Sequence, residues 1–116
     1  MNTVLVVDDD DNIRLLIRDE FCDLNYNVIT AVNGEEALIS FSEEDVDIVV
    51  LDLRMPKIDG LDVLGKIRDT SHVPVIVYTA NPGDFTVENE YDNVQMLPKS
   101  SDITQLTDLV QQTLNV

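Results

Sequence analysis

The chain alternates between short apolar runs and longer segments in which apolar residues recur at helical spacing. Each apolar run is four to seven residues long, and most are rich in valine and isoleucine. Such runs are typical of strands in a parallel sheet, where both faces are buried. The predicted strands are residues 3–7, 27–31, 47–52, 73–79 and 94–97.

The segments between these runs have the pattern of amphipathic helices. The first covers residues 12–24, and its predicted core stripe consists of Ile13, Leu16, Ile17, Phe21 and Leu24. A second helix is expected after Asn33, because Asn33 and Glu36 have the spacing of a capping box. Further helices are predicted over residues 61–69 and after a cap at Ser101 or Asp102.

Residues 82–91 fit a helix poorly, because Gly83, Thr86 and Val87 have low helix propensity. We therefore expect a fourth helix that is short or irregular. Strict alternation of strands and helices predicts an α/β fold with right-handed crossovers. The expected architecture is a doubly wound, flavodoxin-like, five-stranded parallel sheet in the order 2-1-3-4-5, with helices on both faces. Residues 1–116 would form one domain.

The length of 116 residues fits a single hydrophobic core. No apolar stretch approaches the roughly 18 residues of a membrane span, and no signal peptide precedes the first strand. The single cysteine, Cys22, excludes an intrachain disulfide and suits a reducing cytosol. We therefore expect a cytoplasmic protein without a membrane partner.

The formal net charge is −16, and the chain has only seven lysine and arginine residues. Binding to nucleic acid requires lysine and arginine to neutralise phosphates, so no nucleic-acid partner is expected. The acidity favours solubility and metal or basic partners. Only local clusters of acidic residues, and not the total charge, are informative about function.

Reactive side chains stand where four of the five predicted strands end. These are Asp8 and Asp9 after the first strand, Asp52 at the third, Thr79 at the fourth and Lys99 after the fifth. Ligands of open parallel sheets bind beyond the carboxyl ends of the strands, at the switch point in strand order. With the order 2-1-3-4-5, the strands that carry these residues are contiguous. We therefore expect the five side chains to converge on one patch.

Three carboxylates in one cleft repel each other and raise one another's pKa values. A divalent cation removes this repulsion, and Mg²⁺ prefers oxygen ligands while it keeps several waters. Asp8, Asp9 and Asp52 are therefore a candidate Mg²⁺ site. Lys99 adds a positive charge and Thr79 adds a hydroxyl donor, so the set is suited to hold a phosphoryl group during its transfer.

Several stretches of the chain resemble the receiver domain of two-component response regulators: VLVVDDDDNIRLL, VVLDLRMPKIDGLDVL, PVIVYTA and the late Lys99. The resemblance covers essentially the whole chain, and the D-x-R-M-P-x-x-D-G run at 52–60 is specific. It implies a stand-alone, phosphorylation-switched signalling protein that catalyses only its own phosphorylation and dephosphorylation. Such a protein would act by phosphotransfer or partner binding, with no output domain after Val116.

The resemblance also implies roles for the acidic residues. Asp52 would accept a phosphoryl group from a histidine kinase or a histidine phosphotransfer protein, forming an aspartyl phosphate. Asp9, Asp52 and the backbone carbonyl of Arg54 would bind Mg²⁺, with Asp8 assisting through a water molecule.

The remaining site residues receive roles from the same resemblance. Thr79 would move toward the phosphoryl group, and Lys99 would pair with it. Asp59 and Gly60 would shape the turn that follows the acceptor. The downstream partner would be a protein that the sequence does not identify.

The sequence departs from the family pattern in three places. Ser100 follows Lys99, where the family usually has a proline at a cis bond, and a cis bond without proline costs about 2.5–4 kcal/mol. Met96 stands where the family usually has Phe or Tyr as the signal reporter. The segment from Thr79 to Lys99 is also short. Family members signal their state through this region, so we expect retained phosphorylation chemistry with an unusual readout.

Two other functions remain open on the sequence alone. A strand that ends in D-x-D resembles haloacid-dehalogenase-like phosphatases, with Asp8 as nucleophile and Asp10 as acid/base, although the D-x-R-M-P-x-x-D-G run would then be unexplained. The altered region at Met96 and Ser100 suggests a phosphorylation-independent interaction domain of receiver fold, an alternative that the intact acids, Thr79 and Lys99 disfavour. Asp10 and Asp11 are expected to be helix N-terminal acids, because carboxylates there cap the first turn and complement the helix dipole.

Overall fold

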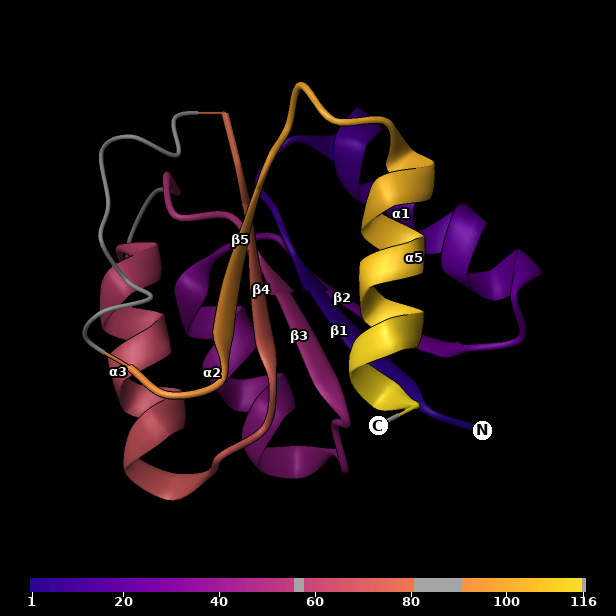
Figure 1. The fold of residues 1–116 in the computed structure, drawn as a ribbon. Coiled ribbons are helices and arrows are strands. Elements are labelled where there is room, and N and C mark those ends of the chain that lie inside the picture. The colour runs from indigo at the N-terminus through magenta and orange to yellow at the C-terminus, as the bar shows by residue number, and fades with distance from the viewer. Residues whose placement is uncertain (56–57, 81–90, 116) are drawn as a thin grey trace.

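The computed structural model describes residues 1–55, 58–80 and 91–115, which form one five-stranded sheet and four helices. The strands are β1 (Thr3–Val7), β2 (Asn27–Ala31), β3 (Ile48–Leu51), β4 (Val75–Thr79) and β5 (Val94–Pro98), and the helices are α1 (Asp11–Asp23), α2 (Gly34–Glu43), α3 (Gly60–Thr70) and α5 (Ile103–Leu114) (Figure 1). Each of these helices is too short or too polar to cross a lipid bilayer. The short fourth helix predicted at 82–91 lies, except for its last residue, outside the described residues.

The five strands are parallel and lie in the order β2-β1-β3-β4-β5, which confirms the predicted topology. β3 occupies the centre, with Val49 opposite Leu5 of β1 and opposite Val75 of β4. β2 and β5 are the two edges. Because all strands run in one direction, their carboxyl ends lie along the same edge of the sheet.

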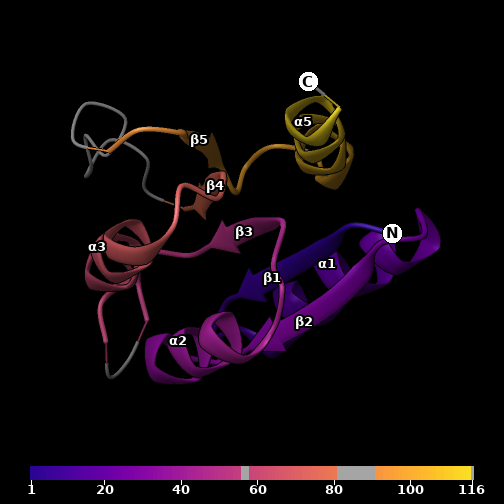
Figure 2. The ribbon, with the colours of Figure 1, turned by 90° about the horizontal axis from the view of Figure 1, so that it is seen from below.

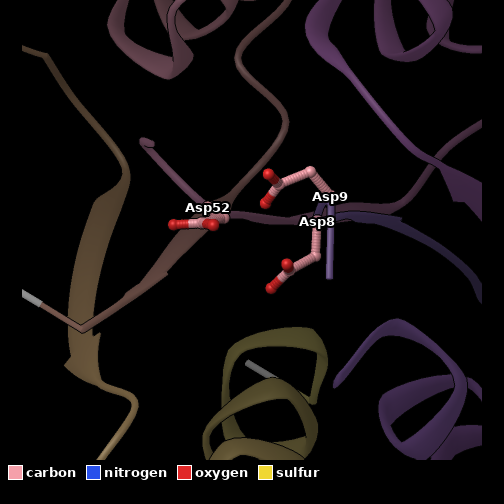
Figure 3. A group of neighbouring side chains, drawn as sticks. All are labelled: Asp8, Asp9 and Asp52. Carbon is pink, nitrogen blue, oxygen red and sulfur yellow. The ribbon is translucent and has the colours of Figure 1, made fainter. Parts of the chain in front are cut away.

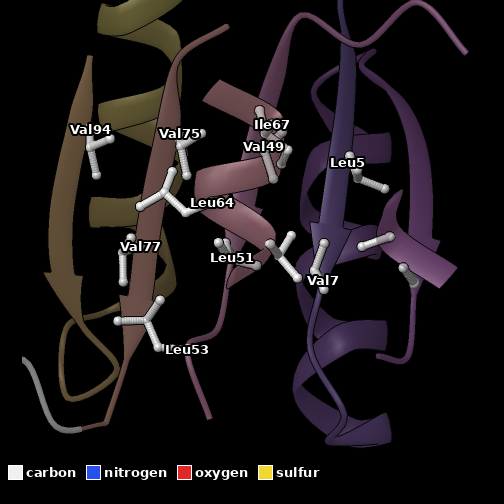
Figure 4. Close-up of a cluster of buried hydrophobic side chains, with 13 residues drawn as sticks. Leu5, Val7, Val49, Leu51, Leu53, Leu64, Ile67, Val75, Val77 and Val94 are labelled. Carbon is white, nitrogen blue, oxygen red and sulfur yellow. The ribbon is translucent and has the colours of Figure 1, made fainter. Parts of the chain in front are cut away.

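The sheet separates two hydrophobic clusters. One cluster contains Leu51 of β3 and Ile67 of α3, together with residues of β1, β4 and α2 (Figure 4). The other contains Phe21 of α1 and Leu106 of α5, packed against the alternate residues of the same strands. Figure 2 shows these two pairs of helices, α2 with α3 and α1 with α5, on opposite sides of the sheet. Strand residues therefore point alternately into the two clusters, as the pleat requires.

The core stripe of α1 is narrower than predicted. Ile17 and Phe21 are buried, and the partly buried Ile13 packs against the same cluster. The prediction of Leu16 and Leu24 in this stripe is wrong, because their side chains are 48% and 42% exposed. Leu16 stands about 100° around the helix axis from Ile17. Leu24 is the C-cap and lies beyond the last turn.

Two strands are shorter than predicted. β4 begins at Val75 instead of residue 73, because Pro74 has no N–H to donate to a neighbouring strand. The Pro74 carbonyl still accepts a hydrogen bond of 3.0 Å from the Val49 amide. β3 ends at Leu51, so Asp52 stands one residue beyond the strand. This residue begins the loop that leads to α3.

Each helix begins at an aspartate or asparagine whose side chain accepts a hydrogen bond from a backbone amide of the first turn. These N-caps are Asp10, Asn33, Asp59 and Asp102. Asn33 accepts from the Glu36 amide at 2.8 Å, as the predicted cap requires. Of the two candidates for the last helix, Asp102 is the cap, and Gln105 completes a capping box with it. The caps fix where each helix starts relative to the strand before it.

Candidate functional site

The carboxyl ends of four strands bring five polar side chains to one edge of the sheet. They are Asp8 and Asp9 after β1, Asp52 after β3, Thr79 at the end of β4 and Lys99 after β5. Hydrogen bonds between backbones continue past the strands, since the Asp52 amide donates to the Val7 carbonyl at 3.0 Å and the Lys99 amide donates to the Thr79 carbonyl at 2.8 Å. The strand order therefore holds these residues at the same level.

Three carboxylates form the centre of the site. Asp8, Asp9 and Asp52 each offer an oxygen, and these oxygens lie within 4.8 Å of one another. Figure 3 shows the side chains of Asp8 and Asp9 both turned toward the side on which Asp52 lies. Asp8 and Asp52 are only 2% and 5% exposed, whereas Asp9 is exposed. The cluster is therefore buried at its base and open to water on one side.

This donor set fits Mg²⁺. All three side chains offer oxygen, which hard divalent cations prefer. Mg²⁺ binds through one or two carboxylates and keeps several of its waters, so an opening to solvent beside Asp9 suits it. The residues present are thus consistent with the cation site that the sequence predicts.

Lys99 bridges two of the carboxylates. Its Nζ lies 2.9 Å from Oδ2 of Asp8 and 3.2 Å from Oδ2 of Asp52. Burial by itself lowers the pKa of Lys99, but its hydrogen bonds and charge interactions with Asp8 and Asp52 outweigh burial and raise that pKa above its ordinary value. The ammonium group is therefore charged at neutral pH and offsets part of the repulsion among the acids.

The carboxylate of Asp52 is held on both oxygens. Oδ2 accepts from Lys99, and Oδ1 accepts from the Arg54 amide at 3.3 Å. Burial raises the pKa of Asp52, the charge of Lys99 lowers it, and the charge of Asp8 raises it again, so that the pKa lies above its ordinary value. Asp52 is thus a buried carboxylate whose charged form is stabilised only in part by its partners.

The turn after Asp52 depends on a glycine. A Cβ atom on Gly60 would lie 2.4 Å from Cα of Leu53 and 2.7 Å from the carbonyl oxygen of Asp52. The Gly60 amide also donates to the Leu53 carbonyl at 3.1 Å. Asp59 caps α3 by accepting from the Leu61 amide at 2.9 Å. These two residues therefore let the start of α3 pack directly against the backbone of Asp52 and Leu53.

Asp10 and Asp11 do not join the carboxylate cluster. The Asp10 side chain accepts from the amides of Asn12 and Ile13, as an N-cap. Asp11 lies in the first turn of α1 and forms an ion pair with Arg14. The phosphatase hypothesis requires Asp10 as an acid/base, but the Asp10 carboxylate caps the N-terminus of α1 instead.

The departures around Lys99 leave the lysine in place. Within residues 1–55, 58–80 and 91–115, no peptide bond is cis, so Lys99 reaches Asp8 and Asp52 without a cis bond before Ser100. Met96 is partly buried and packs against the cluster beneath α2 and α3. Although Ser100 replaces the usual proline, the Lys99 ammonium group therefore still contacts Asp8 and Asp52.

Arg14 is a further residue at this edge that the sequence analysis missed. Its Nη1 donates to the backbone carbonyl of Asp8 at 3.0 Å. Its side chain is only 11% exposed, although it carries a full charge. The spacing of Arg14 from Asp11, three residues along a helix, is a signal for an ion pair. Nothing in the sequence indicates the bond to the Asp8 carbonyl.

Comparison with known proteins gives one family for the chain. The family described as the response regulator receiver domain matches residues 4–111. Over 77 residues the chain is 46% identical to the probable transcriptional regulator ycf27 of Cyanidium caldarium, a stretch that covers 66% of this chain and 31% of that protein. The chain therefore spans about a third of the length of this curated relative.

Solved structures show the same fold over the full length. The response regulator TrrA from Thermotoga maritima, in complex with Mg(2+)-BeF, is 37% identical with a TM-score of 0.86, covering 98% of this chain and 100% of that one. TrrA in complex with the histidine kinase ThkA is 36% identical with a TM-score of 0.87, covering 98% and 99%. The receiver domain of the Francisella response regulator 1452 is 28% identical with a TM-score of 0.89, covering 99% and 98%.

Proposed function

Because this chain belongs to the response regulator receiver domain family, whose members act in phosphorylation-switched signalling, we propose that Asp52 is its phosphoryl acceptor. The observation that carries the proposal is the position of this carboxylate. Asp52 is buried directly after the central strand, Lys99 contacts one of its oxygens, and the carboxylates of Asp8 and Asp9 are close enough to share a cation with it. Asp8 shares the burial, the contact with Lys99 and the carboxylate cluster, but it follows β1, whereas Asp52 follows β3 at the centre of the sheet.

The phosphodonor in this proposal is a histidine kinase or a histidine phosphotransfer protein. TrrA, which shares this fold, forms a complex with the histidine kinase ThkA, and this supports a donor of that class. In the transfer, an oxygen of Asp52 forms a bond to phosphorus while the bond between phosphorus and the donor's imidazole nitrogen breaks. The electron pair of that bond returns to the imidazole, and the product is an aspartyl phosphate.

Mg²⁺ is the cation proposed for the site, and the complex of TrrA with Mg(2+)-BeF supports this choice. Asp9, Asp52 and the backbone carbonyl of Arg54 would hold it, with Asp8 assisting through a water molecule. When bound, the cation would neutralise charge on the transferring group, whose transfer depends mainly on positioning and electrostatics.

Thr79 and Lys99 are proposed to bind the phosphoryl group once it is on Asp52. The Lys99 amide donates to the Thr79 carbonyl at 2.8 Å, so the two side chains start from adjacent backbone positions. Lys99 would exchange its bond to Asp52 for a phosphoryl oxygen, and Thr79 would donate its hydroxyl. The chemistry of the chain is then limited to its own phosphorylation and dephosphorylation, and the signal passes to a protein partner.

The test is phosphorylation of the chain by acetyl phosphate with MgCl₂, followed by intact mass measurement. We expect one phosphoryl group that is stable in acid and labile in base, and no such group on the Asp52→Asn variant. Asp69→Asn is the matched control, because it removes an exposed carboxylate at the end of α3 and should leave labelling unchanged. Labelling that persists in Asp52→Asn, or is absent from the unaltered chain, would overturn the proposal.

A further inference from the structure

We propose that Arg14 is a positioning residue for the cation site, which it serves by fixing the peptide that joins Asp8 to Asp9. This inference rests on the proposed function, since it concerns how the proposed cation ligands are held. Arg14 touches neither the acceptor nor the phosphodonor in this role. It acts through the backbone of its neighbours.

The geometry of Arg14 restrains one particular peptide group. Nη1 donates to the carbonyl oxygen of Asp8 at 3.0 Å, and Nη2 forms an ion pair with the carboxylate of Asp11. The Asp8 carbonyl belongs to the peptide bond that leads to Asp9. A peptide group is planar, so fixing the direction of its carbonyl also fixes the direction in which the chain enters Asp9.

Asp9 is the ligand that most needs this restraint. Asp8 is held through its side chain, which accepts from Lys99 at 2.9 Å and from the Asp10 amide at 2.9 Å. Asp52 is held by Lys99 and by the Arg54 amide. Asp9 is exposed, so little packing restrains its side chain, and the backbone sets the direction in which that side chain leaves the chain. Through that backbone, Arg14 orients the carboxylate on the open side of the cluster.

The guanidinium group suits this task better than an ammonium group would. Its planar fork presents several N–H donors in fixed directions, so it can bond to the Asp8 carbonyl and the Asp11 carboxylate at once. A lysine at this position would keep the charge but lose the fork. Because the side chain of Arg14 is only 11% exposed, its packing also limits the directions it can take.

Positioning and simple electrostatics predict opposite effects on Mg²⁺ binding. A positive charge near the carboxylates repels a cation, so removing the charge of Arg14 alone would tighten Mg²⁺ binding. Loss of a group that orients a ligand weakens binding, typically by 10-fold or more. The sign of the change in Kd therefore separates the two roles.

The experiment is a titration of the ¹⁵N-labelled chain with MgCl₂, followed by NMR, on Arg14→Lys, Arg14→Met and Arg18→Met. Arg18→Met is the matched control, because it removes a charge from the same helix, from a side chain that is 45% exposed and pairs with its neighbour Asp19. The fold of each variant is checked from the dispersion of its spectrum. Arg14→Lys keeps the inference testable if Arg14→Met does not fold.

We expect both Arg14 variants to raise the Kd for Mg²⁺ by roughly tenfold. Their metal-free spectra should also show shifted amides at Asp9 and Asp10, while Arg18→Met leaves Kd within about twofold of the unaltered chain. An unchanged Kd in Arg14→Lys together with a lower Kd in Arg14→Met would overturn the inference and leave only an electrostatic role. An unchanged Kd in both would overturn it and leave only a role in stability.

The same titration separates this inference from the proposed function. If the unaltered chain binds Mg²⁺ and takes a phosphoryl group on Asp52, but the Arg14 variants bind Mg²⁺ equally well, the inference fails and the function stands. If the unaltered chain shows neither property, the proposed function itself fails.

Discussion

The ammonium group of Lys99 lies closer to Asp8 than to the proposed acceptor, with Nζ at 2.9 Å from Oδ2 of Asp8 and 3.2 Å from Oδ2 of Asp52. In the metal-free protein the lysine thus occupies the space between two carboxylates that would otherwise repel each other. Its charge does part of what a divalent cation would do. We therefore expect Lys99 and the proposed Mg²⁺ to compete electrostatically for the same acids.

Replacement of Lys99 by methionine should tighten Mg²⁺ binding while slowing phosphorylation. Removal of the ammonium group leaves more uncompensated negative charge on Asp8 and Asp52, and we expect the Kd for Mg²⁺ to fall by about tenfold, or about 1.4 kcal/mol. The phosphorylated state loses its cation partner, so labelling by acetyl phosphate should be slower. Mg²⁺ titration by NMR and the labelling rate measure the two effects.

Lys66→Met is the control for this pair, because Lys66 lies exposed on α3. It removes the same charge from the chain and should change neither quantity by more than about twofold. Weaker Mg²⁺ binding in Lys99→Met would contradict competition between the lysine and the cation.

Asp52→Asn should stabilise the metal-free protein at neutral pH. Burial raises the pKa of Asp52 above its ordinary value of 3.8, so ionisation of this group favours the unfolded state. An amide of the same shape removes this cost, and we expect a gain of about 1 kcal/mol, or roughly 4 °C in Tm. Thermal unfolding in the presence of a chelator measures it.

The gain should depend on pH in a defined direction. A carboxyl whose pKa is raised in the folded state stabilises the fold when protonated and loses that contribution as pH rises through its folded pKa. The advantage of Asp52→Asn should therefore be greatest at neutral pH and vanish as pH falls below the ordinary value of 3.8. An advantage that grew on acidification would show that burial does not raise this pKa.

Gly60→Ala should destabilise the protein and displace the backbone of Asp52. The added Cβ would lie 2.4 Å from Cα of Leu53 and 2.7 Å from the Asp52 carbonyl oxygen, both backbone atoms that cannot yield as a side-chain end can. We expect a loss of about 2–4 kcal/mol in the free energy of unfolding by urea. Gly65→Ala is the control, since among the described residues its Cβ would meet only the Tyr91 side chain, 3.2 Å from the hydroxyl oxygen and 4.0 Å from Cζ. That change should stay within about 1 kcal/mol, and equal losses in both variants would contradict the close approach at Gly60.

Arg68→Met should weaken the attachment of β5. The Arg68 guanidinium on α3 donates to the carbonyls of Asp92 and Asn93 at 2.9 and 3.0 Å, and to the Ser71 carbonyl at 3.2 Å. These bonds hold the turn before β5, the strand that leads to Lys99. Their loss should lower the free energy of unfolding by about 1.5–3 kcal/mol, measured in urea.

Arg18→Met provides the comparison, because Arg18 is an exposed arginine that pairs with the adjacent Asp19. Exposed ion pairs contribute about 0–1 kcal/mol, so this variant should stay within that range. If the two arginine variants lost the same stability, the bonds of Arg68 to the turn would have no measurable effect.

The strand order and the site could be predicted together because they have one physical origin. Alternation of buried apolar runs with amphipathic helices leaves few topologies, and the parallel direction places every strand end at one edge. Asp8, Asp9, Asp52 and Lys99 could then be assigned to one site without knowledge of any distance. The contacts of Lys99 with Asp8 and Asp52 agree with that assignment.

What could not be predicted depends on contacts that leave no pattern in the sequence. The bond of Arg14 ends on a backbone carbonyl, which every residue possesses, so residue identity gives no signal for it. Leu16 and Leu24 have the composition of core residues, but the width of the buried face of α1 is set by how that helix packs on the sheet. The first residue of β4 is Val75 because Pro74 has no N–H, and the apolar pattern does not register this loss.

The positions of β3 and β5 in the sheet predict different local stabilities for the backbone at Asp52 and at Lys99. β3, which leads to Asp52, is paired on both sides, whereas β5, which leads to Lys99, is an edge. Edge strands open through smaller, local unfolding events than central ones. Amides of β5 should therefore exchange with deuterium faster than those of β3. Brief openings of the edge would then carry the ammonium group of Lys99 away from Asp8 and Asp52 while the carboxylate of Asp52 stays in place.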